Sequence, residues 1–345
     1  MKCIQDKRYA ILLSVCYLSQ LVIATARPSG LPAGVLVLLF AAGALLQLVL
    51  YRLLSRKQFF DSKTAKILIA LLLSLAAGYD FTRAERFYRA VTARQLSFWW
   101  LIGCMLLIGW YAAHCGRDTV LRAAQPVLVL LLLSLVVLAA SGNYRLESLS
   151  FVRWEDIPLR QMTKVFVEYT FSTELLLWLY WNNHPQPSAV PQQRAAVAKT
   201  QAGILHGGWK LAIRLQFFFA ALFAVLGELA LGTRAAQTPQ LFGVLSLISS
   251  GADAGHGSTL YHCVWLTALA VRVCAHCCVL AELWVQVLPQ WTEKGRMLFS
   301  GILLIGAAIL WEALWRQECT IWLGVAVLLF AAAAHLRRKE RGETG

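Results

Sequence analysis

The sequence predicts an all-α membrane protein in which ten transmembrane helices form a single polytopic domain over residues 1–345. Two observations lead to this fold class. Apolar residues make up 59% of the chain and charged residues 14%, with a mean hydropathy of +0.60. These values are typical of a chain that lies mostly within a bilayer. Apolar runs near the roughly 20 residues that a spanning helix needs also recur along the chain.

The ten predicted helices follow one another with mostly short connections, and prolines mark their limits. Proline interrupts the hydrogen bonding of a helix interior, so we expect each of the nine prolines in a connection or near a helix end. The first run resembles a signal peptide, but we interpret it as a retained helix because further runs follow at regular intervals. The helices are expected at approximately 9–26, 34–54, 65–90, 96–114, 121–141, 163–182, 208–231, 259–287, 296–315 and 319–336.

Two connections are longer than the others. Residues 183–207 begin with a polar, Pro-rich part and then predict a short surface helix. Residues 232–258 contain an apolar stretch that is too short to span. We expect this stretch to lie at the membrane interface or to cap a vestibule.

The formal net charge of +14 is distributed between the apolar runs and does not form one basic patch. This distribution favours membrane topology in a lipid bilayer over a nucleic-acid partner. With ten crossings, the larger share of Lys and Arg falls on the side that carries both termini. By the positive-inside rule, we expect both termini in the cytoplasm.

The sequence indicates neither an enzyme nor a cofactor or metal site. It contains no Gly-rich phosphate loop, nucleophile elbow or metalloprotease motif. The nine cysteines sit mostly within apolar runs, where we interpret them as small core residues in reduced form. Cys274, His276, Cys277 and Cys278 share one helix, point in different directions and lack a second ligand pair, so no metal is predicted.

Ionisable side chains inside the predicted spans mark the interior of the bundle. A charge near the bilayer centre is costly and usually faces the bundle interior or a water-filled cavity. For each such group, the alternative is a structural ion pair or a side chain that reaches the interface. The groups are Asp80, Glu168, Glu174, Arg272 and Glu312, with Glu228 and Glu282 nearer the helix ends.

The sixth predicted helix carries a polar interruption just before Glu174. Ser172 and Thr173 offer hydrogen bonds that compete with a continuous helix, and the first helix has a similar interruption at Ser19 and Gln20. In transporters with a five-plus-five inverted repeat, the discontinuous helices bind substrate near the midplane. The pattern therefore predicts a LeuT-like inverted-repeat fold with helices one and six interrupted.

Arg272 and His276 share one face of the eighth predicted helix, because they lie four residues apart. A guanidinium at membrane depth needs an anionic partner. Asp80 of the third predicted helix and the carboxylate of a substrate are the two candidates.

A resemblance to a known family extends over nearly the whole chain. Residues 110–138, W-Y-A-A-H-C-G-R-D-T-V-L-R-A-A-Q-P-V-L-V-L-L-L-L-S-L-V-V-L, resemble the fourth and fifth helices of the spore germination permeases, the B subunits of nutrient germinant receptors. In the sixth helix, the family's F-x-x-E pattern matches Phe171 to Glu174. Residues 150–158 resemble the family's approach to that helix, and residues 238–251 resemble its Pro-containing external segment.

The resemblance implies the fold of the amino acid/polyamine/organocation superfamily, with ten helices in two inverted repeats. It also implies recognition of a small nutrient, often an amino acid, in the bacterial cell membrane or spore inner membrane, beside A-type and C-type receptor subunits. The chain departs from the family pattern at both breaks. Ser19 and Gln20 stand where the family usually has glycine, and its Phe-Gly-Glu of helix six appears here as Phe-Ser-Thr-Glu.

These features lead to three functional hypotheses. The first is a permease-like integral membrane subunit of a germinant receptor, which recognises a nutrient and triggers germination. The second is a proton-coupled amino-acid secondary transporter, in which Glu168 or Glu174 takes up the proton. The third is a structural or assembly membrane protein whose buried charges are only ion pairs. The predicted ligand-binding residues are Ser19, Gln20, Tyr79, Asp80, Phe171, Ser172, Thr173, Glu174, Arg272 and His276.

Overall fold

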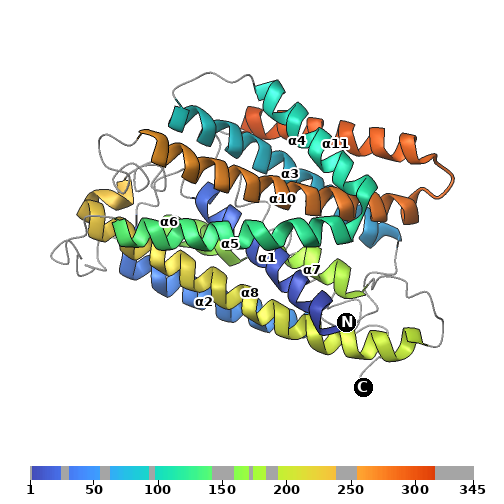
Figure 1. Ribbon diagram of the computed structural model, residues 1–345, viewed down its shortest axis with the longest axis horizontal. Helices are drawn as coiled ribbons and strands as arrows, with labels where there is room; N and C mark the ends of the chain where they lie inside the picture. The colour runs from blue at the N-terminus through green and yellow to red at the C-terminus, as the bar shows by residue number, and fades with distance from the viewer. Residues whose placement is uncertain are drawn as a thin grey trace.

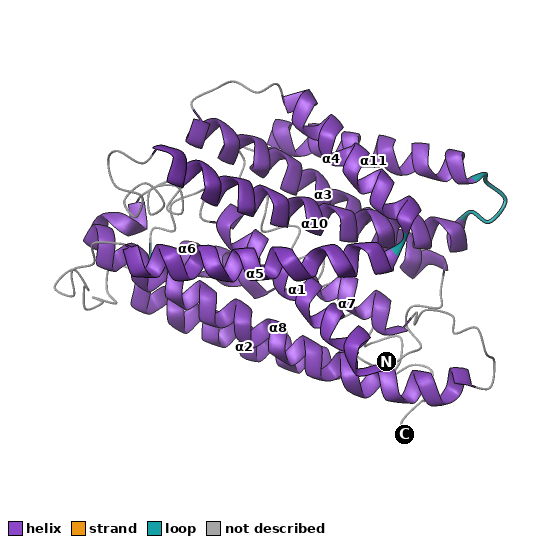
Figure 2. Ribbon diagram, in the orientation of Figure 1, coloured by secondary structure: helices purple, strands orange, loops and turns teal. Residues whose placement is uncertain are grey.

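The computed structural model is a bundle of helices (Figure 1). It describes residues 2–24, 31–54, 63–92, 98–141, 159–170, 174–183, 193–237 and 255–314. Every regular element within these ranges is helical, as Figure 2 shows, which confirms the predicted all-α class for this part of the chain. The elements are α1 (Lys2–Ala24), α2 (Ala33–Leu54), α3 (Lys63–Thr92), α4 (Phe98–Cys115), α5 (Arg117–Ser141), α6 (Leu159–Thr170), α7 (Glu174–Asn183), α8 (Gln193–Leu231), the 3₁₀ helix η4 (Gly232–Gln237), α10 (Gly255–Val287) and α11 (Glu293–Leu314).

Six helices among the described residues are long and apolar enough to cross a membrane. The chain is therefore a multi-pass helical membrane protein, as its composition predicts. By the same measure, α1 and α4 contain shorter apolar helices, Arg8–Ser19 and Trp99–Cys115. The six spanning windows are Ala33–Leu50, Lys63–Thr82, Arg117–Ala140, Trp209–Leu231, Tyr261–Val287 and Glu293–Ala313.

Burial separates a central helix from peripheral ones. The spanning window of α10 is 72% buried, whereas those of α5 and α11 are 28% and 22% buried. The outward faces of the peripheral helices suit lipid, because they carry large apolar side chains that are exposed. Examples are Leu107, Val129, Val136 and Leu298.

Helices α1 and α10 join the two parts of the bundle. On one side, α10 contacts α3, α4 and α11. On the other, α1 contacts α8, which also packs on α2. Helices α1 and α10 contact each other, and both contact α5 and α7. In Figure 1, α3, α4 and α11 accordingly lie in the upper part of the view, and α2 and α8 in the lower part.

Small residues allow α3 to approach α11 closely, and α4 to approach α10. A Cβ atom on Gly78 of α3 would lie 2.6 Å from the carbonyl carbon of Ala307 in α11. A Cβ atom on Gly109 of α4 would lie 2.6 Å from the Cys277 sulfur in α10. Small residues at such contacts let membrane helices gain van der Waals packing.

The cysteines divide between the core and the outer surface. The thiols of Cys274 and Cys278 contact carbonyl oxygens of α4, at 3.8 Å from Ile108 and 3.4 Å from Ala112. The interpretation as core residues holds for four described cysteines and is wrong for three, because those three lie on outward helix faces. The buried free thiols are Cys16, Cys274, Cys277 and Cys278, and the exposed ones are Cys104, Cys115 and Cys263.

Helix α1 is continuous through Ser19 and Gln20, so the prediction of an interrupted first helix is wrong. The Ser19 hydroxyl donates to the carbonyl oxygen of Cys16 in the same helix, at 2.8 Å. The hydroxyl bonds to the backbone of its own helix, and the helix continues past it.

Helix α5 begins earlier than the sequence predicts. Gly116 alone separates it from α4; this residue has φ 84° and its N–H donates to the carbonyl of Ala112 at 2.9 Å. A left-handed glycine of this kind is a common helix end. Because α5 starts at Arg117, Pro126 lies inside the helix and not near its end as expected. Membrane helices tolerate such prolines when neighbouring groups satisfy the freed backbone.

Helix α8 merges two predicted elements. The short surface helix expected within residues 183–207 and the seventh spanning helix form one helix from Gln193 to Leu231. The sequence permits this continuity because no proline occurs between Pro191 and Pro239.

Two predicted segments lie outside the described residues. These are the tenth helix at 319–336 and the apolar stretch of the 232–258 connection. The five-plus-five inverted repeat stays a prediction.

Candidate functional site

Two described elements, α6 and α7, lie within the sixth predicted helix, and its predicted interruption falls on residues outside the described part of the chain. Helix α6 ends at Thr170 and α7 begins at Glu174, and residues 171–173 lie outside the described part of the chain. The two elements have different neighbours. Helix α6 packs on α2, whereas α7 contacts α1, α8 and α10.

A buried side chain of α2 satisfies the end of α6. The last carbonyls of any helix have no partner within it and need another donor when they are buried. The Gln47 amide nitrogen donates to the carbonyl oxygens of Tyr169 and Thr170, at 2.9 and 3.1 Å. One turn away, Gly43 leaves room for α6, because a Cβ atom there would lie 2.6 Å from the Thr170 hydroxyl. Gln47 is absent from the predicted site, although a glutamine within the apolar run of the second helix is a signal in the sequence.

Glu174 is the first residue of α7 and is fully buried. The N-terminus of a helix stabilises a carboxylate, because its free N–H groups and its dipole favour negative charge. A carboxylate oxygen of Glu174 also lies 3.0 Å from a terminal nitrogen of Arg272 in α10.

Arg272 links Glu174 to Asp80. The Nε atom of Arg272 lies 2.8 Å from Oδ2 of Asp80 in α3, and at most 3% of each of the three side chains is exposed. Of the two partners expected for Arg272, the structure contains Asp80, and it adds Glu174. Buried charges need such compensation, since an unpaired charge in an apolar interior is very costly. We call Asp80, Glu174 and Arg272 the ionic cluster.

His276 lies beside the ionic cluster, one turn along α10 from Arg272. Its Nδ1 atom is 4.0 Å from Oδ2 of Asp80, and its ring is fully buried. Neither ring nitrogen has a hydrogen-bond partner within the described residues. The sequence placed His276 on the Arg272 face correctly, because residues four apart on a helix are neighbours.

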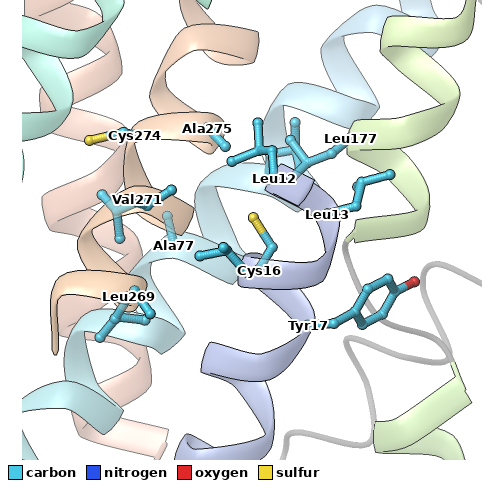
Figure 3. Close-up of a cluster of buried hydrophobic side chains, with 14 of the residues drawn as sticks. Leu12, Leu13, Cys16, Tyr17, Ala77, Leu177, Leu269, Val271, Cys274 and Ala275 are labelled. Atoms are coloured by element: carbon cyan, nitrogen blue, oxygen red, sulfur yellow. The ribbon is translucent and has the colours of Figure 1, made fainter. Parts of the chain in front are cut away.

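Apolar side chains surround Cys16 (Figure 3), which lies close to the ionic cluster. Figure 3 shows Cys16 of α1 among Ala77 of α3, Leu177 of α7 and Val271 of α10. These three apolar residues are close in sequence to Asp80, Glu174 and Arg272, respectively. The Cys16 thiol lies within electrostatic range of all three charged side chains. Because apolar surroundings screen charges weakly, interactions within the cluster are strong.

The other predicted site residues lie elsewhere or outside the described residues. Ser19 is buried and bonded within α1. Tyr79 is next to Asp80 in α3, and adjacent residues of a helix point in different directions. The Tyr79 ring packs on Trp311 of α11, with 5.0 Å between ring centroids. The side chains not described are those of Gln20, Glu168, Phe171, Ser172 and Thr173.

A second polar cluster lies at the end of the bundle where α5 begins. Arg117 forms a two-pronged ion pair with Glu282 of α10, with one contact of 3.0 Å from Nε. The guanidinium also donates to the Tyr9 hydroxyl at 3.2 Å and lies over the Trp181 ring. The contact with Arg117 fits the alternative that Glu282 forms a structural ion pair. The predicted helix bounds place Arg117 in the connection between the fourth and fifth helices. The sequence does not show its contacts with Glu282 and Tyr9, because those residues belong to other helices.

Glu228 and Glu312 have separate positions. A Glu228 carboxylate oxygen accepts from the backbone N–H of Ala33 at 2.8 Å, so α8 caps the start of α2. Glu312 is exposed on the last turn of α11, which fits the alternative of a side chain that reaches the interface.

No group of three or more metal-ligating side chains occurs in the part of the chain that the structure describes. The Cys274 and Cys278 thiols contact α4, whereas His276 lies beside Asp80 of α3.

The chain matches no protein-family model, and a comparison with curated proteins gave no significant match.

Proposed function

We propose that the chain is a permease-like integral membrane subunit of a spore germinant receptor, which recognises a small nutrient and triggers germination. An amino acid is the nutrient class that the family resemblance implies. The observation that most supports this proposal is the buried ionic cluster at the start of α7.

The ionic cluster contains both kinds of charge that an amino acid requires. Arg272 suits a carboxylate, because a guanidinium binds one with two parallel hydrogen bonds. Asp80 and Glu174 suit an ammonium group. The three side chains pair with one another, so Arg272 has carboxylate partners while no ligand is bound. A zwitterionic ligand brings one charge of each sign, so it exchanges with these pairs without changing the total charge.

Helix α7 supplies a route from binding to signalling. Glu174 at its first residue contacts Arg272, and Trp181 near its last residue packs on the Arg117 guanidinium of the second polar cluster. A ligand that displaces Glu174 therefore shifts a short helix whose other end lies at one end of the bundle. By the family resemblance, A-type and C-type receptor subunits receive the signal. The protein would lie in the bacterial cell membrane or spore inner membrane, with both termini cytoplasmic.

The variant Glu174→Gln tests the proposal, because it keeps the side-chain shape and removes the charge. Losing a hydrogen bond to a charged group costs about 1.5–3 kcal/mol, so we expect amino-acid binding to weaken about 10-fold or more. Binding of radiolabelled amino acids is measured on the full chain in lipid nanodiscs, and germination is measured in spores.

The matched control is Glu293→Gln, which removes an exposed carboxylate at the start of α11. It is expected to leave binding and germination unchanged. A normal ligand response from Glu174→Gln at normal protein level would remove Glu174 from the site.

A proton-coupled secondary transporter is the second candidate, because the ionic cluster holds two acidic groups and one basic group. Transport by proteoliposomes separates the two functions. Amino-acid uptake driven by an imposed proton gradient supports the transporter, whereas binding without flux supports the sensor.

A further inference from the structure

The ionic cluster is unbalanced in charge. Asp80 and Glu174 contribute two carboxylates and Arg272 contributes one guanidinium. With all three ionised, the cluster has a net charge of −1. An uncompensated charge deep in a membrane protein is costly, so the interior favours a state in which one positive charge is added.

The neighbouring helices do not supply that charge from their described residues. Apart from the three members of the cluster, the described charged side chains of the helices packed on α3 or α10 lie at exposed positions or towards a helix end, the buried Glu85 of α3 among the latter. The Cys16 thiol and the Tyr17 phenol of α1 lie within electrostatic range of Arg272. The described titratable groups of the other packed helices are Cys104, Tyr111, His114 and Cys115 on α4, Arg117, Asp118 and Arg122 on α5, Tyr180 on α7, and Glu293, Lys294, Arg296 and Glu312 on α11.

The geometry distinguishes the two carboxylates. Glu174 is the first residue of α7, a position at which the helix dipole interacts favourably with a negatively charged side chain. Asp80 lies in the middle part of α3, away from either helix end. A proton that neutralises the cluster therefore belongs on Asp80.

His276 completes the arrangement as a hydrogen-bond acceptor. Its Nδ1 atom is 4.0 Å from Oδ2 of Asp80, about 1 Å longer than a hydrogen bond. Both ring nitrogens are buried and lack a hydrogen-bond partner among the described residues. A neutral imidazole has one ring nitrogen that accepts a hydrogen bond. A small rotation of either side chain brings a protonated Asp80 into contact with the ring.

We propose that Asp80 and His276 form a proton-binding site, in which the Asp80 carboxyl holds one proton and His276 accepts its hydrogen bond. Release of the proton to water leaves carboxylate on Asp80 and restores the net charge of −1. That state favours a cation such as the ammonium group of an amino acid. The site follows from the charges of the cluster and does not depend on whether the chain senses or transports its ligand.

Infrared difference spectroscopy tests the site on the full chain in lipid nanodiscs, without any added ligand. As the pH is lowered, we expect the C=O stretching band of a buried carboxylic acid to appear in the parent protein. Asp80→Asn is expected to abolish this band. His276→Phe is expected to shift the band to higher frequency, because the acid loses its hydrogen-bond acceptor.

A second variant covers the case in which Asp80→Asn does not fold. Glu174→Gln removes the excess negative charge while Asp80 remains, so it is also expected to abolish the band over the same pH range. Direct titration in unbuffered solution should then show the loss of one bound proton per molecule relative to the parent protein.

The control is the exposed carboxylate–histidine pair of the same chain. Glu293 and His114 lie 3.4 Å apart, with both side chains more than half exposed, and Glu293→Gln should leave the buried band unchanged. Absence of a buried acid band in the parent protein, or its persistence in a folded Asp80→Asn or Glu174→Gln variant, would overturn the proposal. Failure of amino-acid binding would not affect this result, because the titration requires no ligand.

Discussion

The Gln47 side chain of α2 donates a hydrogen bond to the carbonyl of Thr170, the last residue of α6. A side chain of one helix thus supports the end of another, in the interior of the protein. The same amide also bonds the Tyr169 carbonyl. The end of α6 therefore depends on its contact with α2 as well as on its own sequence.

Gln47→Leu should destabilise the protein at this contact. The substitution keeps a similar volume but leaves two buried carbonyls without their donor, at about 1–3 kcal/mol for each unsatisfied group. Thermal unfolding in nanodiscs, followed by tryptophan fluorescence, measures the loss. Leu45→Ala is the control, because it changes an outward side chain of the same helix. Equal stability of Gln47→Leu and the parent protein would show that water or another donor replaces the amide.

Gly78→Ala should destabilise the contact between α3 and α11. The added Cβ atom would lie 2.6 Å from the Ala307 backbone and 2.7 Å from the backbone nitrogen of Ala308. Backbone atoms cannot rotate away, so overpacking of about 1–3 kcal/mol is expected. Gly103→Ala on α4 is a matched control, because nothing lies within 4 Å of its added Cβ atom. The prediction fails if both variants unfold at the same temperature.

Arg272→Met should be strongly destabilising, because it leaves Asp80 and Glu174 buried without their cation. Removing one partner of a buried ion pair typically costs about 3–5 kcal/mol. Adding Asp80→Asn and Glu174→Gln to Arg272→Met should restore much of the stability, since no unpaired charge remains. Folded protein is quantified by size-exclusion chromatography of the purified variants.

The triple variant also separates ligand recognition from a purely structural role. If the ionic cluster binds the nutrient, the triple variant folds but gives no germination response. A normal response from the folded triple variant would favour the third hypothesis, a structural or assembly protein whose buried charges are only ion pairs.

Glu228→Ala should weaken the start of α2. The carboxylate accepts the N–H of Ala33 from a helix that is distant in sequence, and loss of a helix cap typically costs about 0.5–2 kcal/mol. Glu228→Gln keeps an acceptor oxygen and should cost less. Thermal unfolding of the pair measures the difference, and the reverse order of stability would contradict capping as the role of Glu228.

The sequence predicts those members of the candidate site that are charged residues within apolar runs. Asp80, Glu174 and Arg272 stand out because each interrupts an apolar run, and the structure brings them together. The position of Glu174 at the start of a helix also agrees with the polar residues that precede it. Gln47 and Arg117 were missed, because their roles come from contacts with helix ends far away in the sequence.

The sequence by itself determined the membrane class and most helix positions, because the length and apolarity of each run decide whether it can span a bilayer. It also determined that certain charges need partners, since apolar surroundings do not solvate them. Only the tertiary structure decided which charges pair, because residues 80, 174 and 272 come from three separate helices. It also decided that α1 stays continuous at Ser19. A hydroxyl can bond within its own helix or disrupt it, and the geometry of the folded helix determines which occurs.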